Sequence, residues 1–299
     1  MSVFNRLLVT TLPLAPKAIV GLVAKRYVAG STLDDAFKVI RDLNAQGAMA
    51  TLDVLGEEVS EREKATAFTD EYVRVLHAIA REGVDSNVSV KLTMLGLKID
   101  EGFCRDNVDR IAAAAGEHGN FVRIDMEDAT TTDATLRIYR EIHARHGNLG
   151  CVLQAYMRRT LGDIDGLPAE KPSVRICKGI YVEPRTIAWK GYDTVRANYI
   201  NALEKLLAKG IYVGIATHDE YLVARAVGLV DKYGVPRDRY EFQMLLGVDD
   251  ELRRILLAGG HRLRVYVPYG RDWYPYSMRR LRENPEVARH VLRAMLSGR

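Results

Sequence analysis

Residues 121–156, FVRIDMEDATTTDATLRIYREIHARHGNLGCVLQAY, contain one complete strand–helix–strand unit. Apolar, β-rich runs at Phe121–Asp125 and Cys151–Ala155 predict the two strands. Between them apolar residues recur at helical spacing, and Gly147 is a typical helix stop. The residues that define this helix are Thr131 or Thr132 at its start and Leu136, Tyr139 and Ile142 along its apolar face. Two strands joined by such a crossover helix are expected to pair in parallel.

The same alternation of strand and helix signals extends along most of the chain. The six further strand candidates are Ala48–Leu52, Val88–Leu92, Val174–Lys178, Ile211–Ala216, Tyr240–Leu245 and Leu263–Val267. Eight strand–helix units make a chain close to the ~250 residues typical of a (βα)8 barrel, which we therefore predict. A doubly wound open sheet is the alternative, because alternation alone does not decide whether the sheet closes. The first strand lacks the GxGxxG turn that would favour a dinucleotide-binding sheet of that kind.

Polar residues at capping positions predict where several helices begin. They are Ser31 with Asp34 for a helix over residues 33–44, Ser60 with Glu63 for the next helix, and Asp219 and Asp249 after the sixth and seventh strands. Gly259 and Gly260 are expected to end the last of these helices.

The composition limits the class of protein. Of the 299 residues 47% are hydrophobic, enough for a large buried core, and no linker or low-complexity tract divides residues 1–299, which we expect to form one domain. The net charge of +4 has no basic run behind it, so no nucleic-acid partner is indicated. Cys104, Cys151 and Cys177 lie far apart, so we expect a reducing cytoplasm and no disulfide framework or metal site.

The N-terminal 47 residues are expected to be a helical segment packed on the barrel. The apolar run from Leu7 to Val23 contains Lys17 and two prolines, so it is too short and too broken for a membrane span. It also lacks the cleavage site of a signal peptide. Peripheral contact with the inner face of the cell membrane through this run is the alternative to packing on the domain.

Polar side chains stand at the C-terminal ends of nearly all the predicted strands. We name these residues the polar rim: Asp53, Lys91, Asp125, Glu127, Gln154, Tyr156, Lys178, Thr217, His218, Gln243 and Tyr266. Each has a structural explanation when taken singly, such as a lysine that simply reaches solvent. In a barrel, however, these strand ends converge on the active site. Their coincidence in position predicts a site that binds a large polar ligand.

The sequence VPYGRDWYPYSMRRLRENP, residues 267–285, predicts a last helix with an unusual face. On a helix that begins near Pro275, four residues fall on one side. They are Tyr276, Arg279, Arg280 and Glu283. Two arginines beside an aromatic ring are a receptor for a carboxylate, which guanidinium binds bidentately. A solvated basic face is the alternative, but it leaves the aromatic pair Trp273-Tyr274 unexplained.

These segments resemble the proline dehydrogenase family along nearly the whole chain. They are RYVAG near Tyr27, SVKLTMLGL from Ser89, VRIDMED from Val122, VLQAY from Val152, VRICKGIYVEP from Val174, IATHD from Ile215, YEFQMLLGV from Tyr240 and YVPYGRDWYPYSMRRL from Tyr266. Each motif alone is weak, but together and in this order they are specific.

The resemblance implies a distorted (βα)8 TIM barrel with short N-terminal helices and a C-terminal helix that covers the active-site mouth. Non-covalent FAD would lie over that mouth. The implied reaction is oxidation of L-proline to Δ1-pyrroline-5-carboxylate by hydride transfer from C5 to flavin N5, the first step of proline catabolism. A membrane quinone would accept the electrons, and pyrroline-5-carboxylate dehydrogenase would be a functional partner.

The resemblance also assigns roles to residues of this chain. The implied catalytic positions are Asp125 and Arg175. The implied substrate-binding positions are Lys91, Arg279, Arg280, Tyr266, Tyr276, Leu245 and Glu283. The implied cofactor-binding positions are Met126, Gln154, Arg175, Lys178, Gly179, Ile180, Tyr181, Thr217 and His218. The chain departs from the family pattern at Cys177, Ile180, Val182 and Asp219.

Other classes of protein remain open from the residues alone. Lys91 suits the Schiff-base amine of a barrel lyase, with Asp125 and Glu127 as proton carriers. His218 with the same two carboxylates suits a metal-dependent hydrolase, although no His-x-His or HExxH ligand set is present. A barrel that only binds or regulates is the third alternative.

Overall fold

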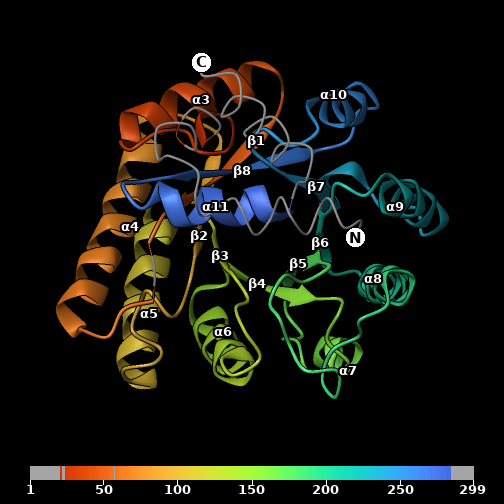
Figure 1. Cartoon of the computed structure of the whole chain (residues 1–299), viewed down its shortest axis with the longest axis horizontal. Helices are drawn as coiled ribbons and strands as arrows, with labels where there is room; N and C mark the ends of the chain where they lie inside the picture. The colour runs from red at the N-terminus through yellow and green to blue at the C-terminus, as the bar shows by residue number, and fades with distance from the viewer. Residues whose placement is uncertain (1–20, 22–23, 57, 284–299) are drawn as a thin grey trace, which may run out of the picture.

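Eight parallel strands form a closed barrel in sequence order in the computed structural model, which describes residues 21, 24–56 and 58–283 (Figure 1). The strands are β1 (Met49–Val54), β2 (Ser86–Val90), β3 (Val122–Ile124), β4 (Leu149–Gln154), β5 (Ser173–Cys177), β6 (Tyr212–Ala216), β7 (Tyr240–Leu245) and β8 (Leu263–Tyr269). Pairing of β1 with β8, from Met49 opposite Arg264 to Val54 opposite Tyr269, closes the sheet. The predicted (βα)8 barrel is therefore confirmed, and the open-sheet alternative is wrong.

Helices surround the barrel: α3 precedes β1, and each strand is followed by a helix. They are α3 (Leu33–Ala45), α4 (Arg62–Glu82), α5 (Glu101–Glu117), α6 (Thr132–His146), α7 (Thr160–Asp165), α8 (Tyr192–Ala208), α9 (Glu220–Lys232), α10 (Asp250–Ala258) and α11 (Trp273–Glu283), with a short 3-10 helix, η2 (Arg237–Arg239), before β7. Helix α3 packs against β1 and β8, where the helix after the eighth strand would otherwise lie. Helix α11 is thereby free to cross the open end of the barrel (Figure 1).

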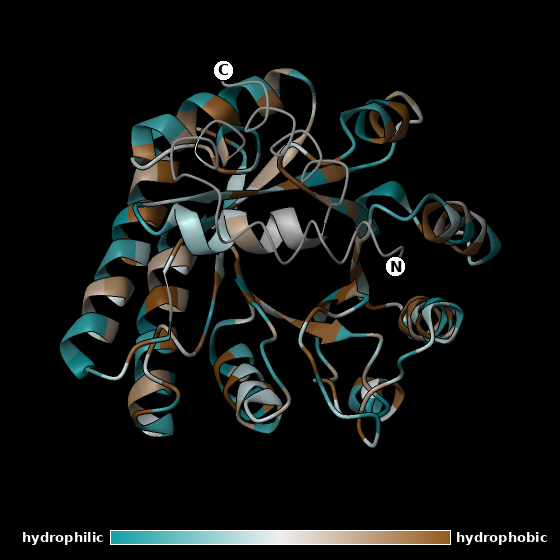
Figure 2. Ribbon diagram, in the orientation of Figure 1, coloured by the Kyte–Doolittle hydropathy of each residue, from teal (hydrophilic) through white to brown (hydrophobic). Residues whose placement is uncertain are grey.

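The two faces of the strands differ in chemistry. Side chains that point outward are apolar, and they form one continuous core with the inner faces of the helices. Figure 2 shows the helices with hydrophobic faces toward the strands and hydrophilic faces outward. Removal of this apolar area from water is the main stabilising contribution to the fold.

The alternate positions on the strands point inward and are largely polar. Buried examples are Thr51, Asp53, Asn87, Ser89, Arg123, Ser173, Arg175, Glu241, Gln243 and Arg264. Such groups cost free energy unless they are hydrogen-bonded, so the barrel interior must be a connected network rather than an apolar filling.

The Glu241–Arg264 ion pair is the clearest buried pair of that network. Arg264 Nε donates to Glu241 Oε1 at 2.8 Å, and its Nη1 donates to the Ala50 carbonyl oxygen at 2.6 Å. Burial alone would raise the pKa of Glu241, but Arg264 outweighs it and lowers that pKa to about 2. The carboxylate therefore contributes stability above its ordinary pKa of 4.5, and this contribution is lost as the pH falls toward 2.

A glycine makes room for a second buried arginine. A Cβ atom on Gly150 would lie 2.2 Å from Arg123 Nη1 and 2.5 Å from the Ser173 carbonyl oxygen, too close for any side chain. Arg123 Nη1 occupies this space and donates to the Cys151 and Ser173 carbonyl oxygens at 3.0 and 2.8 Å. Its pKa is lowered to about 10, first by burial and then by the neighbouring Arg175.

The predicted caps of two helices were wrong. Helix α3 is capped by Thr32 with Asp35, not by Ser31 with Asp34, because the Thr32 hydroxyl accepts from Asp35 N at 3.2 Å. Helix α4 starts after Glu61, so Ser60 and Glu63 do not cap it.

Two aspartates predicted as caps have different outcomes. Asp249 caps α10 as predicted, because it accepts from Leu252 N at 3.0 Å, and Gly259 ends that helix. Asp219 precedes α9, but its carboxylate makes no capping bond and pairs with basic side chains instead.

The predicted N-terminal segment is described only in part. Helix α3 confirms helical structure before β1, whereas residues 1–20, 22 and 23, which include most of the apolar run, lie outside the described residues. Within the part of the chain that the structure describes, no helix combines the length and the apolar character that a membrane crossing requires.

We expect Arg264→Met to destabilise the barrel by about 3–5 kcal/mol, because it leaves the Glu241 carboxylate buried without its cation. Urea denaturation followed by circular dichroism measures this effect. The control is Arg110→Met, which removes an ion pair to Asp70 whose two side chains are half exposed. A loss of less than about 1 kcal/mol in Arg264→Met would show that the pair is not structurally important.

Candidate active site

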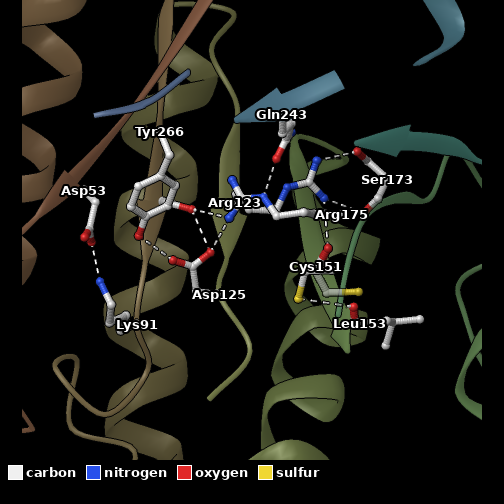
Figure 3. Close-up of polar contacts among 12 residues, drawn as sticks. Asp53, Lys91, Arg123, Asp125, Cys151, Leu153, Ser173, Arg175, Gln243 and Tyr266 are labelled. Atoms are coloured by element: carbon white, nitrogen blue, oxygen red, sulfur yellow. Dashed lines mark hydrogen bonds and ion pairs between the residues drawn. The ribbon is translucent and has the colours of Figure 1, made fainter. Parts of the chain in front are cut away.

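Arg175, on β5, is the centre of the polar network near the C-terminal ends of the strands (Figure 3). Its Nη1 donates to Asp125 Oδ1 at 2.6 Å and to Ser89 Oγ at 3.2 Å, and its Nε donates to Gln243 Oε1. The side chains of Arg175 and Asp125 are only 8% and 15% exposed, so solvent screens this ion pair weakly. The network therefore fixes the guanidinium plane at the base of the barrel mouth.

Tyr266, on β8, extends the same network. Its hydroxyl donates to Asp125 Oδ2 at 2.8 Å, and its ring lies 5.4 Å from Arg175 Cζ (Figure 3). Burial, followed by the negative charges of Asp125 and Asp53, raises the pKa of Tyr266 well above its ordinary value. The hydroxyl therefore stays a hydrogen-bond donor. Because Ser89 Oγ also donates to Asp125 Oδ1, at 2.9 Å, both carboxylate oxygens of Asp125 are occupied.

Lys91 provides a second cation beside this network. It follows β2 and forms an ion pair with Asp53, at the end of β1 (Figure 3). Burial raises the pKa of Asp53, and the charge of Lys91 opposes that rise. The Lys91 side chain is 18% exposed, so it is reachable from the mouth while it neutralises a buried carboxylate. An ammonium held in such a pair is a poor Schiff-base nucleophile, which argues against the lyase alternative.

A separate basic cluster surrounds Asp219 on the β6 side of the mouth. Arg196 donates to the two Asp219 oxygens at 2.8 and 2.6 Å, Lys178 Nζ donates at 3.0 Å, and the Tyr192 hydroxyl also donates at 3.0 Å. Burial would raise the pKa of Asp219, but these donors outweigh it and hold that pKa well below its usual range. Asp219 thus fixes the position of Lys178.

The remaining predicted cofactor positions stand at the ends of β3 to β6. Gln154 Nε2 donates to the Glu127 carbonyl oxygen at 2.9 Å, and His218 Nε2 accepts from Leu245 N at 3.0 Å. The Thr217 hydroxyl accepts from Asp219 N at 3.0 Å. Each of these three side chains of the polar rim is therefore held in place by a main-chain group near a strand end.

The structure brings only some of the predicted site residues into one network. Asp125, Arg175 and Tyr266 are hydrogen-bonded together, whereas Lys178 pairs elsewhere and Ile180 is 43% exposed on the loop after β5. Met126 is buried, and Leu245 and Tyr181 are partly buried. Tyr276, on α11, is buried against Tyr27, Val28 and Leu55. Arg279, Arg280 and Glu283 belong to α11, which begins at Trp273 rather than near Pro275, but their side chains lie outside the described residues.

Three residues of these networks were missed by the sequence analysis. Ser89, on β2, lies two residues before Lys91, a spacing that gives the two side chains the same inward direction. Tyr192 and Arg196 are four residues apart in the first turns of α8, a spacing that places both on one helix face. Nothing in the sequence indicated that this face would meet Asp219.

The residues of the hydrolase alternative are occupied by other contacts. The Glu127 carboxylate accepts from Thr93 N at 3.0 Å and from Thr93 Oγ1 at 2.6 Å, and the Asp125 carboxylate is held by three donors. Within residues 21, 24–56 and 58–283, His218, Asp125 and Glu127 do not gather into a metal-binding group. A cavity of about 430 Å³ between α4 and the loop after β8 is lined by Glu58, Val59, Lys64, Ala67, Phe68, Glu71 and Asp272, so it lies beside the polar rim rather than over it.

Comparison with known proteins identifies the family. The family model described as proline dehydrogenase matches residues 36–293. The chain belongs to the proline dehydrogenase family. It is 39% identical over 280 residues to the proline dehydrogenase of Deinococcus radiodurans, and the match covers 92% of this chain and 90% of that protein. It is 37% identical over 272 residues to proline dehydrogenase 2 of Bacillus subtilis strain 168, covering 91% and 90%.

Solved structures support the same relationship. Proline utilization A from Bdellovibrio bacteriovorus superposes with a TM-score of 0.82 at 25% identity, over 88% of this chain. Proline utilization A from Bradyrhizobium japonicum superposes with a TM-score of 0.73 at 21% identity over 86% of this chain, which supports the fold alone. The chain spans 32% and 30% of these two proteins, about a third of their length. The fold of this chain is thus also present within these two proline utilization A proteins.

We expect Gly179→Ala to destabilise the protein by about 1–3 kcal/mol, since Gly179 has a φ of +105° and a Cβ atom there would lie 2.1 Å from the Tyr156 ring. The control is Gly228→Ala in α9, where the added Cβ meets no atom within 4 Å apart from the adjacent residues and the backbone of its own helix. That variant should be stabilised by up to about 1 kcal/mol. Thermal unfolding of both variants measures the difference, and equal midpoints would contradict the strain at Gly179.

Proposed function

We propose that this protein oxidises L-proline to Δ1-pyrroline-5-carboxylate, the first step of proline catabolism, with non-covalently bound FAD and a membrane quinone as electron acceptor. The observation that supports this most is the Asp125–Arg175–Tyr266 network beside Lys91, at the mouth of a barrel of the proline dehydrogenase family. The network offers fixed cations and an aromatic ring to a small amino acid. All residues of the chain, 1–299, are proposed to form one domain.

The substrate carboxylate is proposed to bind Lys91, Arg279 and Arg280. Lys91 is fixed by Asp53, and its side chain is partly exposed. The two arginines lie on α11, the helix that crosses the mouth. Three cations around one carboxylate hold a compact amino acid in one orientation and disfavour a cationic substrate. The rings of Tyr266 and Tyr276 with Leu245 would enclose the pyrrolidine ring, and Glu283 would pair with an arginine.

The residues at the mouth fit a flavin. Among the described residues, Arg175 uses Nε and Nη1 in the network and makes no hydrogen bond through Nη2, which leaves a fixed donor for an acceptor edge of the flavin ring. The proposed contact residues are Met126, Gln154, Arg175, Lys178, Gly179, Ile180, Tyr181, Thr217 and His218. Met126 and Ile180 are apolar, whereas Arg175 and Lys178 are cations, a combination that suits a ring with apolar and polar edges. When bound, the flavin would supply the acceptor, its N5, for the hydride from proline C5.

The proline nitrogen must lose a proton before C5 can release a hydride. The positive charges proposed around the substrate, those of Lys91, Arg279 and Arg280, would together disfavour the protonated amine and assist loss of its proton to solvent. Asp125 already accepts hydrogen bonds from Ser89, Arg175 and Tyr266. We therefore propose that it orients Arg175 and Tyr266 and does not accept the proton. Tyr266, held as a donor by that carboxylate, would fix the substrate ring from the β8 side.

The partners follow from the proposed reaction. The product is a reactive imine, so pyrroline-5-carboxylate dehydrogenase is proposed as the functional partner. Reoxidation by a membrane quinone would require a cytoplasmic protein that reaches the inner face of the cell membrane peripherally. No nucleic-acid partner and no resident metal in the reaction are proposed.

The first experiment is the visible absorption spectrum of the purified protein before and after anaerobic L-proline. We expect a flavin band that bleaches with L-proline, and acid precipitation should release FAD because no covalent link is proposed. D-Proline is the matched control and should bleach the band far more slowly. A yellow protein that does not respond to L-proline would refute the substrate, and a colourless protein that takes up no added FAD would refute the reaction class.

We expect Arg279→Ala and Arg280→Ala each to lower kcat/KM for proline by roughly 30- to 800-fold, because each removes a charge-assisted contact worth about 2–4 kcal/mol. Steady-state kinetics with an artificial electron acceptor measures this change, which should appear mainly in KM. Arg254→Ala, on the exposed side of α10, is the control and should behave like the wild type. Near-normal proline kinetics in both variants would refute the carboxylate role of α11.

A further inference from the structure

Two histidines meet at the end of the barrel opposite the mouth. His77 lies on α4, and His118 follows the last residue of α5. Helices α4 and α5 lie side by side (Figure 1). His77 Nδ1 and His118 Nε2 are 2.8 Å apart, and the two rings are nearly perpendicular at 87° with centroids 5.1 Å apart. The preceding residue, Glu117, brings a carboxylate to the same place, and the ligand atoms of all three lie within 4.8 Å of one another.

We propose that His77, Glu117 and His118 bind a divalent transition metal ion, with zinc as the best fit. Imidazole nitrogens and a carboxylate oxygen are preferred zinc ligands, at about 2.0–2.2 Å from the metal. Three protein ligands leave a fourth position for water. Among the described residues, this is the group of histidine, cysteine and acidic side chains whose ligand atoms converge closely enough to hold an ion.

The contact between the two rings indicates that they can act as ligands. A hydrogen bond between ring nitrogens requires one of them to be an unprotonated acceptor, so a lone pair already points toward the partner ring. The other ring becomes a ligand by a tautomer change, which moves its proton to the nitrogen on the far side. Two ligands of a tetrahedral zinc ion lie about 3.3 Å apart, so the rings must separate by only roughly 0.5 Å. Both residues are exposed, which permits this adjustment.

The surroundings of the site favour a cation. Glu117 is the last residue of α5, where the helix dipole is negative. Within the described part of the chain, the Glu117 carboxylate enters no ion pair, so its charge is available to a metal. Other described histidines are engaged differently: His146 pairs with Asp109, and His143 is held by two carbonyl oxygens.

The expected consequence is a link between α4 and α5 rather than a role in redox chemistry. Each helix precedes the start of a strand, α4 before β2 and α5 before β3, so the site lies at the N-terminal ends of the strands. In barrel enzymes that end contributes to stability, and the opposite end contains the chemistry. A metal bound only by the folded protein raises the unfolding temperature. The site is therefore independent of the proposed proline oxidation.

The test is a titration with Zn²⁺ of a chain made without a polyhistidine tag and first stripped with a chelator. We expect one Zn²⁺ to bind per chain in calorimetry and excess Zn²⁺ to raise the Tm by about 3–6 °C. His77→Gln and His118→Gln should each weaken binding by at least about tenfold and abolish the rise in Tm. Glu117→Gln should weaken binding by a smaller factor.

The control is His261→Gln, which removes an imidazole just before β8 whose Nδ1 lies 2.8 Å from the Tyr240 hydroxyl oxygen. This variant should bind Zn²⁺ as the wild type does. Circular dichroism and the Tm of each variant without metal verify that it is folded. The proposal is overturned if the wild type binds no Zn²⁺ below millimolar concentration, or if His77→Gln and His118→Gln bind it as tightly as the wild type.

Discussion

The Arg175 guanidinium is the group on which the arrangement of the barrel interior depends. It contacts Ser89 on β2, Asp125 after β3 and Gln243 on β7, and it approaches the Tyr266 ring on β8. A single side chain from β5 therefore connects strands on opposite sides of the barrel. A buried guanidinium is stable only if most of its donors and its charge are satisfied, so these partners are required by its burial. Whatever binds at the mouth meets a surface whose geometry is already fixed.

The barrel separates the sources of stability and of chemistry. Outward-facing strand residues and the helices form the apolar core, while the inward positions form a polar network. Arg123 shows what the polar interior requires: no carboxylate of the described residues contacts it, and it donates to two carbonyl oxygens and to the Ser173 hydroxyl. Its pKa of about 10 still leaves it charged near neutrality. The other two buried arginines on the strands, Arg175 and Arg264, are instead paired with carboxylates.

The placement of α3 explains how α11 comes to lie over the mouth. Because α3, from before the first strand, covers the junction of β1 and β8, the helix after β8 is not needed in the outer ring. Tyr276 packs on Leu55, just after β1, and on Tyr27 and Val28, so the start of α11 is anchored to the N-terminal part of the described chain. The predicted arginine pair thus belongs to a helix that crosses the site rather than to the outer surface of the barrel.

The sequence by itself determined the number and order of the strands and helices, because alternating hydrophobic periods are local properties of the chain. It also determined which residues stand at strand ends, and so most of the polar rim. It missed boundaries such as the cap at Thr32, since neighbouring Ser31 and Thr32 offer equivalent hydroxyls.

Only the tertiary structure decided that the sheet closes and that Asp125, Arg175 and Tyr266 share one network. The structure also decided that the Asp219 carboxylate pairs with Arg196 rather than capping the helix that follows it. It likewise placed His77 against His118, 41 residues away in the sequence. These contacts join residues far apart in the chain. Their geometry depends on strand register, barrel closure and helix packing, which no local pattern specifies.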